Sequence, residues 1–390
     1  MGSGARLGSG APLGNDLVRD GITFFKHFNP FGQGILSRKI DILSLSHNAL
    51  NEYVSSTHPS FRTNQIYRWL WKQGVRSFDE MTNVPEPLRN RLKEECTINS
   101  LELAKSQTAL DGTIKLLFAL RTGQHIETVL IPDLNSDGTA SRLTVCVSSQ
   151  VGCAMACSFC ATGQMRFRQN LTSGEIVDQV LIINKLALEH YDSRVTNIVF
   201  MGMGEPLLNY DAVLDSIEKL TSPEGMDLSA RRITVSTVGL AARIRQLADD
   251  ETRFNLAVSL HSPFDEKRSS IMPVNRKAKT DLKSLMQAIQ YYTSSTKKAI
   301  TYEYCMFEGF NDSIADAKEL ARLVKRAPSK VNLIMYNPVE GLGFQRSSEK
   351  CLNDFISCLV RERVTVTVRR SRGQDIDAAC GQLAVKNTID

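Results

Sequence analysis

The sequence predicts an α/β protein, a partial barrel of six β-α units with a small helical domain in front of it. Between residues 142 and 370, short apolar stretches alternate with amphipathic helices, which is the pattern of a parallel sheet covered by helices. Six such units are too few to close an eightfold barrel. Between residues 40 and 110 helical spacing dominates, which indicates a separate domain.

The chain before the barrel divides into three predicted parts. Residues 1–39 are expected to be a flexible leader or an expression scar, because the start is rich in Gly and Ser and lacks a secretory apolar run. Residues 40–110 form the helical accessory domain, a candidate RNA contact. Residues 111–141 form a β-hairpin connector that carries Glu127. The connector strands are expected at 115–120 and 126–131.

The barrel is predicted to span residues 142–370, and residues 371–390 form a C-terminal loop and tail that carries Cys380. Strands are expected at 143–147, 197–201, 232–236, 255–259, 299–306, 331–335 and 364–368. Helices are expected at 173–189, 210–220, 240–248, 281–294, 313–325 and 348–361. In such sheets the functional residues gather at the carboxyl ends of the strands.

The composition is that of a globular protein and gives one hint about its partners. Hydrophobic residues make up 42% of the chain, and no apolar run reaches the roughly 20 residues of a membrane span. The net charge of +5 permits an anionic partner such as RNA. The nine cysteines are an odd number in a long chain, so we expect metal-binding or catalytic thiols in a reducing compartment and no disulfide framework.

Three cysteines lie close together in the run Cys153-Ala-Met-Ala-Cys157-Ser-Phe-Cys160. Protein thiolates normally ligate all four irons of a [4Fe–4S] cluster, so three cysteines leave one iron open for a substrate or cofactor. The alternatives are a zinc site with a remote fourth ligand and three unrelated buried thiols. Zinc sites usually combine two paired half-sites, and the sequence has no second pair. The spacing resembles that of the radical S-adenosylmethionine (radical SAM) enzymes, whose fold is a partial (β/α)6 barrel.

A glycine-rich segment, Met201-Gly-Met-Gly-Glu205-Pro206, follows the next apolar strand. Glycines at a strand end let the backbone approach a ligand closely. The pattern alone is common in turns, but after a cysteine triplet in a β-α repeat it is informative. Radical SAM enzymes have a Gly-Glu segment at this place that holds the methionyl end of SAM.

The chain resembles the RlmN group of adenine-C2 RNA methyltransferases from about residue 45 to residue 384. The matching segments are ETVLIP at 127–132, CVSSQVGC at 146–153, GMGEPLLN at 202–209, SLH at 259–261, NP at 337–338 and DIDAACGQL at 375–383. The related Cfr group, which methylates adenine C8, shares much of this pattern and is the first alternative. An alternative of another class is an iron–sulfur RNA-binding protein that does not methylate.

The resemblance implies a role for each matched residue. Cys380 would carry the methyl group, Cys146 would resolve the adduct, and Glu127 would remove the proton from adenine C2. From the residues alone, Glu127 could equally point to solvent, and both cysteines could be idle thiols. The implied SAM ligands are Gly204, Glu205, Ser236, Ser259, Leu260, His261 and Asn337, and the implied cluster ligands are Cys153, Cys157 and Cys160.

The resemblance also implies two SAM molecules per turnover, one to methylate Cys380 and one to start radical chemistry on that methyl group. The expected partners are 23S-type ribosomal RNA, the tRNA adenine beside the anticodon, and an electron donor such as flavodoxin or ferredoxin. We expect a monomer with no membrane contact in the cytoplasm, with the chloroplast or mitochondrion as alternatives. Candidate phosphate contacts are Arg62, Arg68, Lys72, Arg166, Arg168, Arg361, Arg363, Arg369, Arg370 and Arg372.

Overall fold

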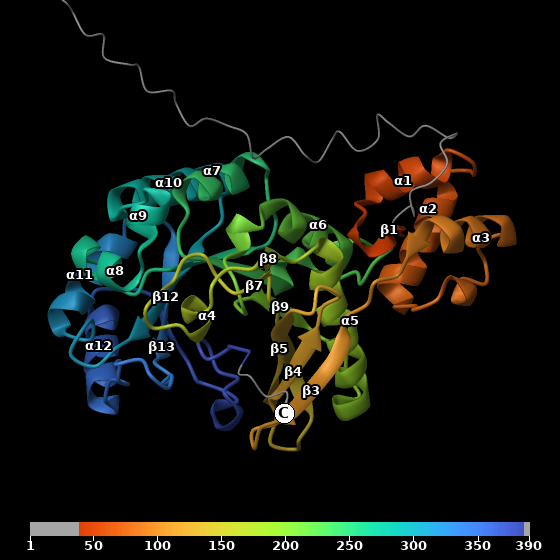
Figure 1. Cartoon of the computed structure of the whole chain (residues 1–390). Coiled ribbons are helices and arrows are strands. Elements are labelled where there is room, and N and C mark those ends of the chain that lie inside the picture. Colours follow the sequence, from red (N-terminus) through yellow and green to blue (C-terminus); the bar gives the residue numbers. More distant parts are fainter. Residues whose placement is uncertain (1–38, 386–390) are drawn as a thin grey trace, which may run out of the picture. The chain divides into compact units, whose positions relative to one another are not determined.

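The computed structural model describes residues 39–385, and most of its strands join one mixed sheet (Figure 1). The strand order across this ten-stranded sheet is β14-β13-β12-β11-β10-β9-β6-β5-β4-β3. The predicted leader before Lys39 and the end of the predicted tail lie outside the described residues. The described residues from Ile40 onward pack as one compact unit, so the barrel, connector and helical part belong together.

Seven parallel strands form the barrel portion of the sheet, as the sequence predicts. Their bounds are β6 Ala140–Cys146, β9 Asn197–Phe200, β10 Ile233–Thr237, β11 Asn255–Ser259, β12 Ile300–Met306, β13 Ser329–Met335 and β14 Val366–Arg369. Each pairs in parallel with the next. Since β14 and β3 remain edges, the barrel is open.

The six predicted barrel helices are present and lie outside the strands (Figure 1). Their bounds are α5 Ser173–Tyr191, α6 Tyr210–Thr221, α7 Ala241–Asp249, α10 Leu282–Thr296, α11 Ile314–Val324 and α12 Glu349–Arg361. The sequence analysis missed α4 Ala161–Gln164, α8 Asp265–Ile271 and α9 Val274–Ala278. Each of these has seven residues or fewer, too short for a periodic apolar face to show.

The predicted hairpins extend the barrel sheet with antiparallel strands. These are β3 Glu102–Thr108, β4 Ile114–Ala119 and β5 His125–Leu134, and both turns contain a glycine with positive φ. Strand β3 lies within residues 40–110, which were expected to be helical, so the strands begin earlier than the predicted connector. Strand β5 pairs with β6, so that Val129 lies opposite Cys146. This register brings Glu127 near the carboxyl end of the first barrel strand. Glu127 is only 5% exposed, so the interpretation that it points to solvent is wrong.

The N-terminal part is mostly helical, as predicted, and is held against the barrel by buried charged groups. Its helices are α1 His47–Ser55, α2 Phe61–Arg68 and α3 Glu86–Glu95. Arg76 Nη1 donates to Oδ1 of Asp178 on α5 at 2.6 Å, and the Leu101 N–H donates to Oδ2 at 2.7 Å. Lys219 on α6 is fully buried and lies over the Trp71 ring, with 5.3 Å between Nζ and the ring centroid.

Arg68 and Lys72, two of the residues expected to contact phosphate, instead bond to the barrel where the N-terminal part packs against it. Arg68 forms an ion pair with Glu224, and its Nη2 lies 2.9 Å from Oε1. The Nζ of Lys72 donates to the carbonyl of Pro223 at 3.4 Å. Both acceptors follow α6 of the barrel, so these cations join the two parts of the chain in this structure.

Candidate active site

The cysteine triplet lies on the loop between β7 Gln150–Val151 and α4. Cys157 is buried, and Cys153 and Cys160 are half-buried. Burial raises the pKa of each thiol, and the other two thiols raise that of Cys157 further. Among residues 39–385, no three His, Cys, Asp or Glu side chains lie close enough to hold one metal ion. The three thiols are therefore not arranged around a single zinc ion, whereas a cluster takes each thiolate on a different iron.

The backbone beside the triplet fits a group with anionic sulfur. The N–H groups of Gly163 and Thr162 point at the Cys160 thiol, and after the opposing effect of burial they lower its pKa. Such donors stabilise the thiolate that a metal needs. A Cβ on Gly163 would lie 2.5 Å from the carbonyl oxygen of Cys157, so this close turn requires glycine. The donor set therefore suits a [4Fe–4S] cluster.

The segment Gly204-Glu205 lies at the carboxyl end of β9. Gly204 has φ +103°, and a Cβ there would lie 2.6 Å from the Cβ of Gln150. Glu205 is buried; its Oε1 accepts from the Leu207 N–H at 3.1 Å and its Oε2 from the Val238 N–H at 2.8 Å. Burial raises the pKa of Glu205 to about 7. Its charge also raises the pKa values of Cys153 and Cys157, so Glu205 lies near the triplet.

His261 follows β11 and contacts the triplet loop. Its ring packs edge-on against Phe159, with 4.9 Å between centroids, and its Nδ1 accepts the Cys305 N–H at 2.9 Å. Burial lowers the pKa of His261 to about 3, so the ring is neutral with its proton on Nε2. The neighbouring residues of the implied SAM site lie on the same strand ends: Ser236 on β10, Ser259 at the end of β11, and the buried Leu260 after it.

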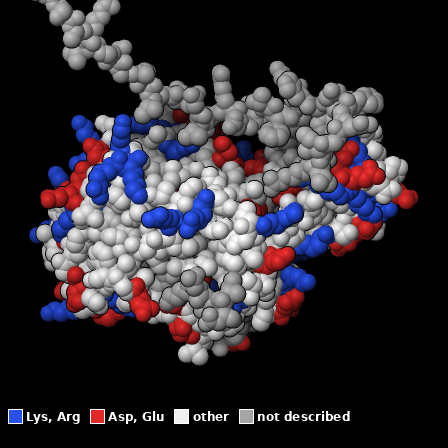
Figure 2. Space-filling model, in the orientation of Figure 1, with Lys and Arg blue, Asp and Glu red and all other residues white. Residues whose placement is uncertain are grey.

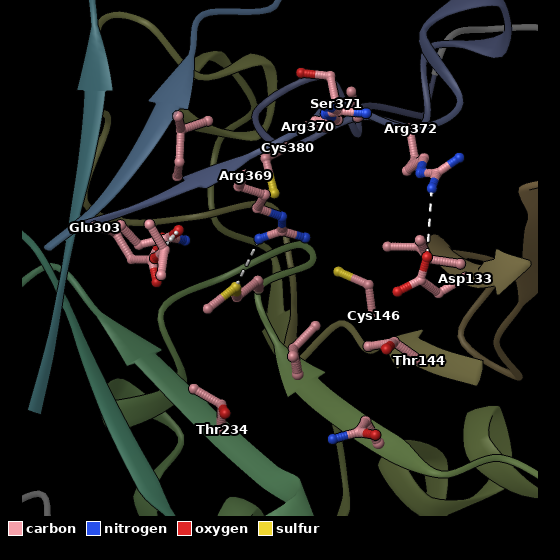
Figure 3. A pocket seen from close by; sticks show the side chains of 18 of the residues that line it. Asp133, Thr144, Cys146, Thr234, Glu303, Arg369, Arg370, Ser371, Arg372 and Cys380 are labelled. Atoms are coloured by element: carbon pink, nitrogen blue, oxygen red, sulfur yellow. Dashed lines mark hydrogen bonds and ion pairs between the residues drawn. The ribbon is translucent and has the colours of Figure 1, made fainter. Parts of the chain in front are cut away.

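Cys146 and Cys380 share one cavity of about 580 Å³ (Figure 3). Cys146 is the last residue of β6 and is buried, while Cys380 lies on the C-terminal loop. Burial raises the pKa of the Cys146 thiol, and the charge of Cys380 raises it further. The Nδ2 of Asn337, another predicted site residue, donates to the Cys380 carbonyl at 3.3 Å.

The C-terminal loop is bonded directly to the triplet loop. The Ala161 N–H donates to the carbonyl of Gly381 at 2.8 Å, and Thr162 Oγ1 donates to the carbonyl of Leu383. Cys380 also raises the pKa of Cys160 by its charge. Cys380 therefore lies beside the triplet and Cys146 shares its cavity, although the cavity itself is lined by neither the triplet nor Glu205.

Arg369, at the end of β14, is a site residue that the sequence analysis placed among phosphate contacts. Its guanidinium lies between Cys380, Cys146 and Glu303 (Figure 3), and its Nη1 donates to Met201 Sδ at 3.2 Å. The charges of Cys380, Glu303 and Cys146 raise the pKa of Arg369. A pattern of basic residues in the sequence cannot distinguish this inward arginine from its exposed neighbours.

Glu127 lies beneath the C-terminal loop and does not line the cavity. Its Oε1 is 3.4 Å from Lys115 Nζ, which also donates to the Asp377 carbonyl at 3.4 Å. Its Oε2 is buried and accepts no hydrogen bond from the described residues. Burial raises the pKa of Glu127, and Lys115 opposes this rise. The Ala384 N–H on the C-terminal loop also opposes the rise. The chain therefore holds a desolvated carboxyl group close to the loop that carries Cys380.

Two family models match the chain. Residues 40–98 match the N-terminal domain of ribosomal RNA large subunit methyltransferases of the RlmN type, and residues 147–324 match the radical SAM superfamily. A Salinibacter ruber protein named probable dual-specificity RNA methyltransferase RlmN is 56% identical, over 90% of this chain and 95% of its own. The chain belongs to the RlmN family of radical SAM enzymes.

Further RlmN proteins and one solved structure agree. A Christiangramia forsetii protein of the same name is 46% identical, over 91% of this chain and 99% of its own. The crystal structure of a radical SAM methyltransferase from Sphaerobacter thermophilus superposes with a TM-score of 0.81 at 43% identity, covering 89% of this chain and 100% of that one. The RlmN fold predicted from the sequence, an open radical SAM barrel with a helical N-terminal part, is thus confirmed.

Proposed function

We propose that this RlmN-family enzyme methylates C2 of an adenine in large-subunit ribosomal RNA and in tRNA beside the anticodon. The observation that supports this best is the cavity shared by Cys146 and Cys380 beside the triplet. A transfer from SAM straight to RNA has no use for two facing thiols. A methyl group carried on one thiol and released by the other needs both.

The residues for the cofactors follow from the family and from the geometry. Cys153, Cys157 and Cys160 would hold a [4Fe–4S] cluster. SAM would be bound by Gly204, Glu205, Ser236, Ser259, Leu260, His261 and Asn337. Together the cluster and SAM supply one-electron cleavage chemistry that can activate a methyl C–H bond. We propose two SAM molecules per turnover, since the methyl group on Cys380 must also come from SAM.

Three side chains would then perform the transfer. The Cys380 thiolate takes up the methyl group, and the activated carbon on Cys380 bonds to adenine C2. Glu127 accepts the C2 proton, for which its desolvated carboxyl group and raised pKa are suitable. The adduct also has to lose its unpaired electron, for which the cluster held by the triplet would supply the acceptor. The Cys146 thiolate then attacks the Cys380 sulfur; the S–S bond forms as the sulfur–carbon bond breaks, the bonding pair stays on the carbon, and the carbon takes a proton. The proposed electron donor would reduce the disulfide before the next turnover.

The cavity suits an anionic substrate. Six of its lining side chains are Lys or Arg and two are Asp or Glu: Arg142, Arg232, Lys330, Arg369, Arg370 and Arg372 against Asp133 and Glu303. Arg232 and Lys330 lie at the amino ends of their strands, so basic groups extend along the barrel interior. Figure 2 shows basic side chains mixed with acidic ones on the face in view, without one continuous basic area. We infer that phosphates are bound near the cavity and that the adenine leaves its stack to enter it.

The remaining partners and the location are proposed on weaker support. No described helix combines the length and apolar character needed to cross a bilayer. We propose a cytoplasmic monomer that receives electrons from flavodoxin or ferredoxin. The relatives named above are bacterial, and nothing among them supports an organelle.

Nucleoside analysis tests this function against its alternatives. RNA from cells with and without the gene is digested and compared by mass spectrometry with 2-methyladenosine and 8-methyladenosine standards. We expect 2-methyladenosine that depends on the gene. Gene-dependent 8-methyladenosine would favour the Cfr-like activity. Absence of both, with no 5′-deoxyadenosine formed from SAM by the purified enzyme, would favour a non-methylating RNA-binding protein.

Replacing Glu127 by Gln should lower product formation by about 10²–10⁴-fold, the usual contribution of a general base. Cleavage of SAM in the first turnover should continue, because Glu127 acts after it. Product and 5′-deoxyadenosine are quantified in the same single-turnover reaction. Lys115→Met is the companion variant: loss of Lys115 raises the pKa of Glu127 further, so the acidic limb of the rate profile moves to higher pH. An unchanged profile would contradict the assignment.

Replacing Arg369 by Met should make Cys146 less reactive. Arg369 opposes the rise in the pKa of Cys146, so its removal lowers the thiolate fraction at any pH below that pKa. Peptide mass spectrometry after brief iodoacetamide treatment should show the Cys146 alkylation curve shifted to higher pH, with Arg369→Lys close to wild type. Alkylation of the half-buried Cys351 on α12 is the internal control. Equal curves for Cys146 in all three proteins would exclude an electrostatic role for Arg369.

A further inference from the structure

Arg268 on α8 is a buried cation without a partner of opposite charge. None of its surface is exposed. Its Nη2 donates to the carbonyl oxygens of Val238 at 2.5 Å and Ser259 at 3.4 Å, while Nε and Nη1 are buried and bond to no described residue. No carboxylate among residues 39–385 forms an ion pair with it. Such a group is costly unless an anion or acceptor outside the chain completes it.

Asp265, whose charge acts on Arg268, does not fill this role. Asp265 lies one turn before Arg268 and affects its pKa through charge alone. The Oδ1 of Asp265 accepts instead from the Leu282 N–H and from Asn275 Nδ2, both at 3.0 Å. Asp265 therefore accepts no hydrogen bond from Nε or Nη1 of Arg268.

Helix α8 is fastened to the triplet loop. The carbonyl of Ile271, at the end of α8, accepts the Ser158 N–H at 2.9 Å. From α9, Lys277 Nζ donates to the Ala154 carbonyl at 2.5 Å. Ala154 and Ser158 each directly follow a cysteine of the triplet, Cys153 and Cys157. Helices α8 and α9 thus brace the loop from one side.

Arg268 lies between this loop and the ends of strands β10 and β11. Its carbonyl acceptors, Val238 and Ser259, belong to those strand ends. Arg268 lies close enough to Cys157 and to His261 for its charge to act on both. The positions of its bonds and the reach of its charge agree that the guanidinium faces the triplet at Cys157.

We propose that Arg268 is a positioning residue that donates hydrogen bonds to the anionic sulfur of the cluster at Cys157 and makes the cluster easier to reduce. Three thiolates give the cluster region net negative charge, and reduction adds one more. A buried cation stabilises the more negative state, and hydrogen bonds to sulfur act in the same direction. The inference rests on the proposed function, because it needs the cluster to be present.

The test is a redox titration followed by electron paramagnetic resonance on the full-length, anaerobically reconstituted enzyme without SAM or RNA. In Arg268→Gln, the ratio of reduced to oxidised cluster at a given potential should fall about tenfold, which is about 59 mV for a one-electron couple. Arg268→Lys keeps the charge and should show a smaller shift. The matched control is Arg276→Gln, an exposed arginine on the neighbouring α9, which should match wild type. Iron and sulfide content and the Kd for SAM are measured on each protein.

Each outcome decides the inference. A wild-type potential in Arg268→Gln with at least tenfold weaker SAM binding would assign the donors to the SAM carboxylate and overturn the proposal. Unchanged potential and unchanged SAM binding would leave a purely structural arginine and also overturn it. If Arg268→Gln takes up no cluster, the lysine variant decides: cluster uptake supports the need for charge, and loss in both overturns it. A wild-type protein that forms no cluster would instead refute the proposed function.

Discussion

Cys157→Ala should leave the protein without a stable [4Fe–4S] cluster and without measurable RNA methylation. Cys157 is buried at the centre of the triplet, where its thiolate interacts with both other thiols. Alanine supplies no ligand, so the cluster would be left with two of its three thiolates. Iron and sulfide are assayed after anaerobic reconstitution, together with methyl transfer to RNA.

Cys351→Ala is the matched control for this experiment. Cys351 is half-buried on α12 and belongs to neither the triplet nor the cavity. It should keep the iron, the sulfide and the activity of wild type. Full iron and sulfide in Cys157→Ala would refute the assignment of the triplet as the cluster site.

Cys146→Ala should stop the reaction at a covalent protein–RNA adduct after at most one turnover. In the proposed sequence, Cys146 supplies the sulfur that displaces the bound methylene carbon from Cys380. Without it, the Cys380–carbon bond persists. A denaturing gel with labelled RNA should show a species that contains both protein and RNA, with the adduct equal in amount to the active enzyme.

The double variant Cys146→Ala/Cys380→Ala separates this mechanism from non-specific crosslinking. It lacks the sulfur to which the carbon is bonded, so no adduct should form. Persistence of the adduct in the double variant would move the attachment to another residue. Rapid product release from Cys146→Ala, with no adduct, would show that Cys146 is not the resolving thiol.

Regular elements of the barrel could be predicted because their signals are local. Alternating apolar residues predict β10 and β11, and amphipathic spacing predicts α5 and α12, to within a few residues of their observed ends. The short helices α8 and α9 could not be found this way. They are too short for a periodic apolar face, and their contacts with the triplet loop, such as the bond from the Ser158 N–H to the carbonyl of Ile271, join residues far apart in the sequence.

The site residues likewise fall into two groups: those that local motifs predict and those whose position only the tertiary structure shows. Cys146 and Cys380 were recognised from motifs, and the structure brings them into one cavity. The inward positions of Arg369, which was expected among the phosphate contacts, and of Arg268 could not be predicted, because an arginine in a charged segment gives no local sign that it turns inward. Burial of Glu127 was likewise undecided in the sequence, since alternation in a strand has two equivalent registers relative to solvent. In the structure β5 is buried on both faces from Ile126 to Leu130, and Lys115 joins Glu127 to the C-terminal loop at Asp377.

The proposed reaction requires the methyl group to pass through Cys380. To test this, the enzyme is first methylated on Cys380 with deuterated SAM, freed of it, and allowed one turnover on RNA with unlabelled SAM. Mass spectrometry of the digested RNA should then find 2-methyladenosine with two deuterium atoms, because one is removed on activation and replaced by a proton on release. A methyl group with three deuterium atoms, or with none, would contradict the proposed route.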